Sequence, residues 1–176
     1  MPANLIPKIR PAPPRDIFTD ELLKHNIRDA VVLIGKRGWY SEGDNERGIY
    51  DDAIFFHSPS GVMVFNANTD PTRYGFNSSV GKGMASLKPG VWRYKVGQHK
   101  EIRPALVQAA PVTVKRDGGK EETGYFGINI HPGSYNSTSS EGCQTIWPDQ
   151  WQSFINLVVG ELKRYQQQIA CYLLIE

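Results

Sequence analysis

Two residues that can act together as a nucleophile and its base, His131 and Cys143, lie twelve positions apart in the sequence. A free cysteine has a pKa of about 8.5 and is only a few per cent thiolate at neutral pH, so a nucleophilic cysteine needs a neighbouring base or cation. His131 supplies that base if the polar loop between them folds back. Backbone N–H groups at Cys143 and its neighbours could then bind an oxyanion. The same spacing also fits a buried cysteine beside a histidine without a catalytic role.

The other residues with catalytic or metal-binding side chains lack partners at a useful spacing. Among the remaining histidines, His99 is the best candidate because it follows a Pro-Gly hairpin segment. A zinc site using His131 and Cys143 would need a third ligand that the sequence does not identify, so no metal or other cofactor is expected. Asp51 and Asp52 are adjacent, and adjacent strand residues point to opposite faces, which makes them a poor glycosidase pair.

The composition argues against several classes of protein. A chain of 176 residues, 40% hydrophobic and 22% charged, is typical of one folded domain. Its net charge of +2 creates little attraction for nucleic acid, and no apolar run approaches the roughly 20 residues of a membrane span. The two cysteines cannot form a disulfide framework, and Cys171 stands among apolar residues as an expected core residue. We expect no nucleic-acid partner and no membrane span.

The middle of the chain is predicted to consist of strands separated by turns. The expected strands are Ala30–Gly35, Ile49–His57, Val62–Asn66, Val91–Val96, Pro111–Lys115 and Tyr125–Ile130. The turn sequences Pro59-Ser60-Gly61 and Asp117-Gly118-Gly119 predict hairpins and antiparallel neighbours. Residues 66–89 contain no predicted element, and long loops of this kind often border a site.

Helices are expected on both sides of these strands. Thr19 is predicted to cap a short helix, and Pro148 begins a longer one that extends to Gln168 and precedes a final strand, Ile169–Ile175. The apolar stripe of the longer helix is Trp151, Phe154, Ile155, Val158, Val159, Leu162 and Tyr165. Residues 1–15 hold five prolines and are expected to form an extended tail, with one domain over residues 16–176. The predicted class is mainly β with flanking helices (α+β), the C-terminal helix packing on the sheet.

The residues around the histidine and the cysteine also carry a family resemblance. The pattern His131-x-Gly133 followed by Ser140-x-Gly142-Cys143 resembles the active-site motif of the L,D-transpeptidase catalytic domain. The upstream segment Leu87–Tyr94 is similar to a hairpin segment of that domain, and the likeness covers roughly residues 50–147. The stretches Arg47–Asp52 and Asn66–Pro71 also look like those of phage- or prophage-encoded relatives.

The resemblance implies a β-sandwich and a cysteine enzyme that acts on peptidoglycan stem peptides. Cys143 would attack an L,D peptide bond with His131 as base, in an L,D-carboxypeptidase or transpeptidase reaction. The implied oxyanion and substrate-binding residues are Gly133, Ser140, Gly142 and Gln144. Glu141 stands where the family has a second histidine and could orient the imidazolium or raise the cysteine pKa. Thr145 stands where the family usually has an arginine, so substrate choice is expected to differ.

The expected location follows from the substrate. The N-terminal residues have no apolar stretch typical of a signal peptide, while peptidoglycan lies outside the membrane. The interpretation is a protein made in the cytoplasm that reaches the periplasm or cell wall through a phage holin, or as a toxin delivered by a secretion apparatus and countered by an immunity protein. The alternative from another class is a catalytically idle relative that binds a wall peptide or a partner protein.

Overall fold

The computed structural model describes residues 14–41, 44–100 and 102–176. Its helices are the 3-10 turn η1 (Arg15–Phe18), α1 (Thr19–Lys24) and α2 (Pro148–Arg164). Its strands are β1 (Val32–Lys36), β2 (Asp52–Ser58), β3 (Gly61–Asn68), β4 (Phe76–Asn77), β5 (Lys82–Gly83), β6 (Ala85–Leu87), β7 (Gly90–His99), β8 (Arg103–Gln108), β9 (Val112–Arg116), β10 (Glu121–Gly124), β11 (Ile130–Pro132), β12 (Gln144–Ile146) and β13 (Ala170–Ile175).

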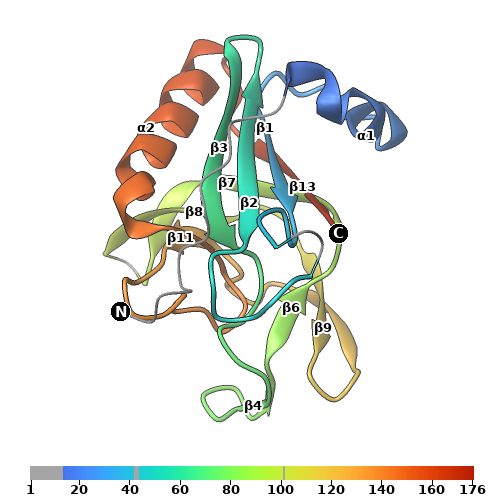
Figure 1. Cartoon of the computed structure of the whole chain (residues 1–176), viewed down its shortest axis with the longest axis vertical. Coiled ribbons are helices and arrows are strands. Elements are labelled where there is room, and N and C mark those ends of the chain that lie inside the picture. Colours follow the sequence, from blue (N-terminus) through green and yellow to red (C-terminus); the bar gives the residue numbers. More distant parts are fainter. Residues whose placement is uncertain (1–13, 42–43, 101) are drawn as a thin grey trace.

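The main sheet closes on itself as a barrel in the order β1-β13-β7-β8-β11-β12-β3-β2 (Figure 1). Most neighbours are antiparallel, including β2 and β3, which meet at the predicted turn before Gly61. Two pairs are parallel, β1 with β13 and β11 with β12. Closure pairs both edges of the main sheet.

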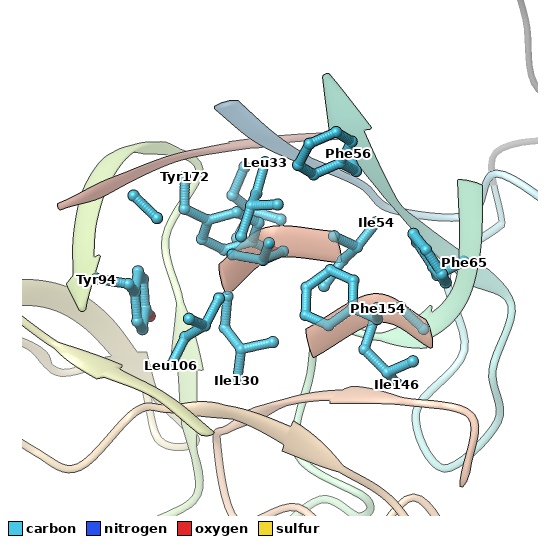
Figure 2. Close-up of a cluster of buried hydrophobic side chains, with 14 of the residues drawn as sticks. Leu33, Ile54, Phe56, Phe65, Tyr94, Leu106, Ile130, Ile146, Phe154 and Tyr172 are labelled. Carbon is cyan, nitrogen blue, oxygen red and sulfur yellow. The ribbon is translucent and has the colours of Figure 1, made fainter. Parts of the chain in front are cut away.

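The barrel is filled by apolar side chains that alternate along its strands (Figure 2). Side chains from opposite walls, such as Ile54, Leu106 and Tyr172, meet in one buried cluster. The buried face of α2 adds Phe154 to this cluster, where its ring contacts Phe65 edge to face at 5.1 Å between centroids. The helix therefore belongs to the same core as the sheet.

A second apolar cluster lies on the outer face of β1, β2 and β13. It contains Phe55 and Cys171, with Phe18 from η1 and Leu22 from α1 packed against them. Figure 1 shows α1 on the side of the barrel away from α2. Each helix thus covers apolar surface that its neighbouring strands would otherwise expose.

Two smaller sheets extend beyond the barrel. One has the order β10-β9-β6, with β9 and β10 joined at the predicted Asp117-Gly118-Gly119 turn, and the other pairs β4 with β5. Both lie below the barrel in Figure 1. They place short strands near the barrel end at which β11 and β12 are connected.

The mainly-β class with helices is confirmed, and so are the strands that correspond to β1, β2, β3, β7, β9 and β13. The strand predicted at Tyr125–Ile130 is wrong, because residues 125–129 are irregular and β11 begins only at its last residue. The prediction of no element within residues 66–89 is also wrong, since β4, β5 and β6 lie there. The strand β8 is absent from the predicted set.

The helix predictions need two corrections. Phe18 is the N-cap residue of α1 and Thr19 is its first helical residue, so the predicted Thr19 cap is wrong. In α2, which ends at Arg164, Val159 is 40% exposed and does not belong to the buried stripe, whereas Val158 is fully buried. Most of the predicted tail, residues 1–13, lies outside the described residues. No helix among the described residues is long and apolar enough to cross a membrane.

Candidate active site

The parallel pairing of β11 and β12 brings His131 and Cys143 to one place in the barrel wall. His131 lies within β11, and Cys143 immediately precedes β12. The N–H of Gln144 donates to the carbonyl of Asn129, which fixes the register of the two strands. The loop from Gly133 to Gly142 folds back as expected from the sequence, because it must return the chain to a parallel neighbour.

The two side chains line the same cavity of about 180 Å³. The Sγ atom of Cys143 and one ring nitrogen each of His131 and His99 lie within 4.8 Å of one another. The other lining residues are Asn77, Val80, Ala85, Lys100, Arg116, Phe126, Gly127, Ile128, Ser139, Glu141 and Gly142. The structure thus joins the predicted pair to a second histidine that comes from the end of β7.

The Cys143 thiol is held by backbone groups of the irregular segment before β11. Its S–H donates to the carbonyl of Gly127 at 3.2 Å, and Sγ accepts from the N–H of Asn129 at 3.4 Å. Burial raises the pKa of the thiol to about 11, although the Asn129 N–H and Lys100 act in the opposite direction. Cys143 is therefore a neutral thiol at neutral pH, at the wall of the cavity and 9% exposed.

The imidazole of His131 is held in one tautomer. Its Nδ1 lies 2.8 Å from the carbonyl oxygen of Pro132, and because a carbonyl only accepts, Nδ1 carries the proton. The lone pair of the neutral ring is then on Nε2. Burial lowers the pKa of His131 to about 4, and the nearby His99, Lys100 and Arg103 add to this effect. His131 is neutral at rest and has a lone pair available to take a proton.

His99 stacks on His131, with ring centroids 4.2 Å apart and planes inclined by 22°. Its Nδ1 lies 3.1 Å from Nδ2 of Asn129. The orientation of the Asn129 amide is set by its Oδ1, which accepts from the N–H of Gln108, so the amide nitrogen is the donor to His99. In the neutral ring of His99 the proton is therefore on Nε2. Burial, Lys100 and Arg103 lower its pKa, which favours this neutral form.

Ser140 positions the turn that carries the cysteine. Its Oγ donates to the carbonyl of Cys143 at 2.6 Å and accepts from the N–H of Gly142 at 3.0 Å. Thr72 binds Ser140 twice, its Oγ1 accepting from the Ser140 N–H and its N–H donating to the Ser140 carbonyl. These bonds engage the Gly142 N–H, while the Cys143 N–H has no hydrogen-bond partner among the described residues. Of the backbone donors expected at the oxyanion, the Cys143 N–H is the free one.

Two glycines near the site are required by close packing. Gly142 has φ of +149°, and a Cβ there would lie 2.5 Å from the carbonyl oxygen of Ala85. Gly142 also lines the cavity, but the group that it approaches closely is the backbone of Ala85. A Cβ at Gly133 would overlap the hydroxyl of Tyr50, which binds the backbone of Ser134. Gly133 is absent from the cavity wall and lets Tyr50 hold the returning loop.

Gln144 and Thr145, the residues after the cysteine, point away from the cavity. Gln144 is buried, and its amide accepts from the hydroxyl of Tyr172 and donates to the carbonyl of Gly142. Thr145 is buried as well, with its hydroxyl lacking a hydrogen-bond partner among the described residues. Neither they nor Ser140 line the cavity. Ser140, Gly133 and Gln144 make contacts that hold the site together, and their expected contacts with a substrate stay a prediction.

Glu141 is exposed and lines the cavity. Its carboxylate makes no hydrogen bond or ion pair with any residue in the described part of the chain, so the structure does not show the expected orienting contact with His131. Its charge adds a small effect that raises the pKa of Cys143. The two cations at the cavity are Lys100, which is exposed, and Arg116, which is buried and bonded to Glu122. Lys100 has no ion-pair partner among the described residues and can meet an anionic group.

The cluster of His99, His131 and Cys143 has the side-chain types of a zinc site. His131 is arranged as metal-binding histidines are, with Nδ1 bonded to a backbone carbonyl and Nε2 unprotonated. His99 does not fit, because the Asn129 amide occupies its lone pair and leaves an N–H toward other partners. The hydrogen bonds therefore favour proton transfer and hydrogen bonding over metal binding.

Comparisons with known proteins identify no family: no protein-family model, no curated protein and no solved structure matches the chain. The site is therefore interpreted from its own geometry and from the motif resemblance. Sequence reasoning missed the role of Asn129 and gave His99 only a secondary place. The signal for His99 was its position after the Pro-Gly hairpin.

Proposed function

We propose that the protein is a cysteine enzyme of the L,D-transpeptidase type that cleaves or exchanges the L,D peptide bond of peptidoglycan stem peptides. The observation that carries this proposal is the meeting of Cys143 and His131, which lie within 4.8 Å of each other at a cavity open to a substrate. The motif around the two residues supplies the substrate class. The mainly-β fold agrees with the coarse class that the resemblance implies, while the L,D-transpeptidase sandwich itself is part of the proposal.

The resting state determines how such a reaction would begin. Thiol and imidazole are both neutral at pH 7, so no thiolate–imidazolium pair exists before the substrate binds. The S–H turns from the Gly127 carbonyl to His131, and the proton moves to Nε2 as sulfur attacks the peptide carbonyl. The imidazolium then protonates the leaving amine, releasing D-alanine from a tetrapeptide stem and leaving a thioester on Cys143. Water or an acceptor amine attacks the thioester, with His131 again taking the proton.

The cavity offers groups for a zwitterionic stem peptide. Lys100 can meet a carboxylate, and the carboxylate of Glu141, which is unpaired within the described part of the chain, can meet an ammonium group, so the same opening presents both signs of charge. The absence of a cation at Thr145 moves carboxylate binding to another position than in the family motif. The substrate would be reached in the periplasm or cell wall, after holin release or delivery by a secretion apparatus, with an immunity protein as a further partner.

One observation favours the alternative of a protein that binds wall peptides without turnover. The Cys143 S–H is bonded to Gly127 in the resting state, and burial raises the thiol pKa to about 11. A binding protein would keep this arrangement when a peptide enters the cavity. An enzyme must break it.

Defined muropeptides distinguish the two functions. We expect the wild-type protein to release D-alanine, or to exchange it for an added D-amino acid, with product masses identifying hydrolysis or transfer. Cys143→Ala should lose this turnover and still bind the peptide. The matched Cys171→Ala variant should retain it. Peptide binding by the wild-type protein without any change in mass would contradict the enzyme and support the binding protein.

A further inference from the structure

We propose that His99 donates a hydrogen bond from Nε2–H to the carbonyl oxygen that Cys143 attacks, and thus stabilises the oxyanion of the tetrahedral intermediate. This inference deepens the proposed function and rests on Cys143 being an acyl-accepting nucleophile. It assigns a catalytic role to a residue that lies 44 positions before the cysteine in the sequence.

The first argument is position. His99 is the last residue of β7 and lines the cavity together with His131 and Cys143. One of its ring nitrogens lies within 4.8 Å of both the thiol sulfur and a nitrogen of His131. A carbonyl carbon attacked by that sulfur has its oxygen within reach of groups at this distance. His131 is committed to the proton of the thiol, so the second ring is free for another task.

The second argument is the location of the proton. The Gln108 N–H fixes Oδ1 of Asn129, and the Asn129 amide then donates to Nδ1 of His99. The polar atom that His99 can offer to a ligand is therefore Nε2 with its hydrogen. A fixed donor needs no reorganisation when negative charge develops, which is the property that makes oxyanion stabilisation effective.

The third argument is the charge of the pair. His99 and His131 are stacked at 4.2 Å, and two imidazolium rings at this distance would repel each other. His131 must become an imidazolium during the reaction, so His99 has to stay neutral. Burial, followed by the charges of Lys100 and Arg103, lowers the pKa of His99 and so favours its neutral form. A neutral imidazole can donate to an oxyanion and leave the second proton transfer to His131 alone.

The donors for the oxyanion would then be two, the N–H of Cys143 and Nε2–H of His99. The Cys143 N–H has no hydrogen-bond partner among the described residues. The two donors come from the end of β7 and from the turn immediately before β12. No loop needs to close to bring them together.

The test compares a carbonyl electrophile with an alkyl electrophile. p-Nitrophenyl acetate acylates a cysteine through an oxyanion, whereas iodoacetamide alkylates it without one. We expect His99→Phe, which keeps a ring to stack on His131, to slow acylation of the protein by the ester about 100-fold. Alkylation of Cys143 by iodoacetamide should change less than about threefold, since the loss of the donor does not affect it. His99→Gln, which restores an N–H donor, should recover part of the acylation rate.

Asn129→Asp tests the tautomer with little change in shape. An aspartate accepts from Nδ1–H of His99 and so moves the proton away from Nε2. Ring ¹⁵N chemical shifts should report Nε2–H in the wild type and Nδ1–H in this variant, and ester acylation should fall as it does in His99→Phe. The iodoacetamide rate of the same variant measures any effect of the new charge on the thiol. His25→Phe, outside the cavity, is the matched control and should behave as wild type.

Each outcome bears on one of the two proposals. Acylation of His99→Phe at the wild-type rate, or an equal loss of acylation and alkylation, would overturn the oxyanion role. A wild-type protein that forms no acyl-enzyme with the ester would overturn it as well. A protein with His99-dependent acylation that leaves muropeptides unchanged would keep the oxyanion role and contradict the proposed substrate.

Discussion

Cys143 and Cys171 are the two cysteines of the chain, and burial raises the pKa of both thiols, to about 11 and about 12. Their surroundings differ. Cys171 lies on β13 in the apolar cluster covered by η1 and α1, and is fully buried. Cys143 lies at a cavity wall beside two histidines, in a turn held by the hydroxyl of Ser140. The direction of the pKa shift therefore does not distinguish the two cysteines, and Cys171 also has polar neighbours in Asp29 and Arg93. What differs is access, because Cys143 borders the cavity and Cys171 does not.

The most direct way to break this comparison is to label the native protein. Iodoacetamide at pH 9 should alkylate Cys143 at least about 100-fold faster than Cys171, because Cys143 borders the cavity and Cys171 is fully buried. Peptide masses after digestion give the two rates. In urea both residues should react at similar rates. Equal labelling of the two cysteines in the native protein would contradict the difference in access.

The largest loss of stability is expected from a substitution in the apolar core. Val158→Asp places a charge in the barrel core beside α2 and should cost more than about 4 kcal/mol, enough to unfold a domain of ordinary stability. Val159→Asp is the matched control, since Val159 is 40% exposed, and should change stability by about 0.5 kcal/mol. Urea unfolding followed by circular dichroism measures both. A folded Val158→Asp protein would mean that the core face of α2 is wrongly assigned.

The apolar core and the polar site around Cys143 also differ in how far the sequence predicts them. The barrel strands rich in β-branched and aromatic residues are found from alternation and turn residues, as is α2 from its apolar period. β8 is missed because it contains a proline, which argues against a strand in the sequence. Pro104 lies near the start of β8, opposite Gln98 near the end of β7, where a proline is tolerated. The strands β4, β5 and β6 are two or three residues long, too short for any period to show.

The segment Tyr125–Ile130 resembles a strand in sequence for a reason that the structure corrects. It has alternating apolar residues, but the N–H groups of Phe126 and Ile128 donate to Oε1 of Gln108 in place of a neighbouring strand. A side chain satisfying two backbone groups leaves no mark on local pattern. The contact of His99 with His131 is likewise beyond local pattern, because it depends on β8 lying between β7 and β11 in the closed sheet. The pairing of His131 with Cys143 is within reach because the motif itself contains both residues.

The pH dependence of acylation tests whether His131 and Cys143 titrate as buried groups or as exposed ones. Burial lowers the pKa of His131 to about 4 and raises that of Cys143 to about 11, so both are neutral between these values. Protonation of His131 removes the lone pair that takes the thiol proton, and the ester acylation rate should therefore fall as pH drops through about 4. Between pH 6 and 8 the rate should change less than about threefold. A rate that halves near pH 6.5 would show that His131 titrates as an exposed histidine.

The smallest expected effect concerns Glu141. Its carboxylate is exposed and without hydrogen bonds in the described part of the chain, and its charge raises the pKa of Cys143 only as a minor contribution. Glu141→Gln should therefore lower the thiol pKa slightly and speed alkylation of Cys143 at pH 9 by less than about threefold, because exposed charges are screened by water and salt. This gain in alkylation rate should shrink further in 0.5 M salt, because salt screens a charge–charge interaction and does not weaken a direct hydrogen bond in the same way. Ester acylation should keep its pH profile, since His131 is oriented by the Pro132 carbonyl. A fall of tenfold or more, together with a shifted pH profile, would show instead that the carboxylate turns to His131 during the reaction and that the polar site is completed only when a substrate is bound.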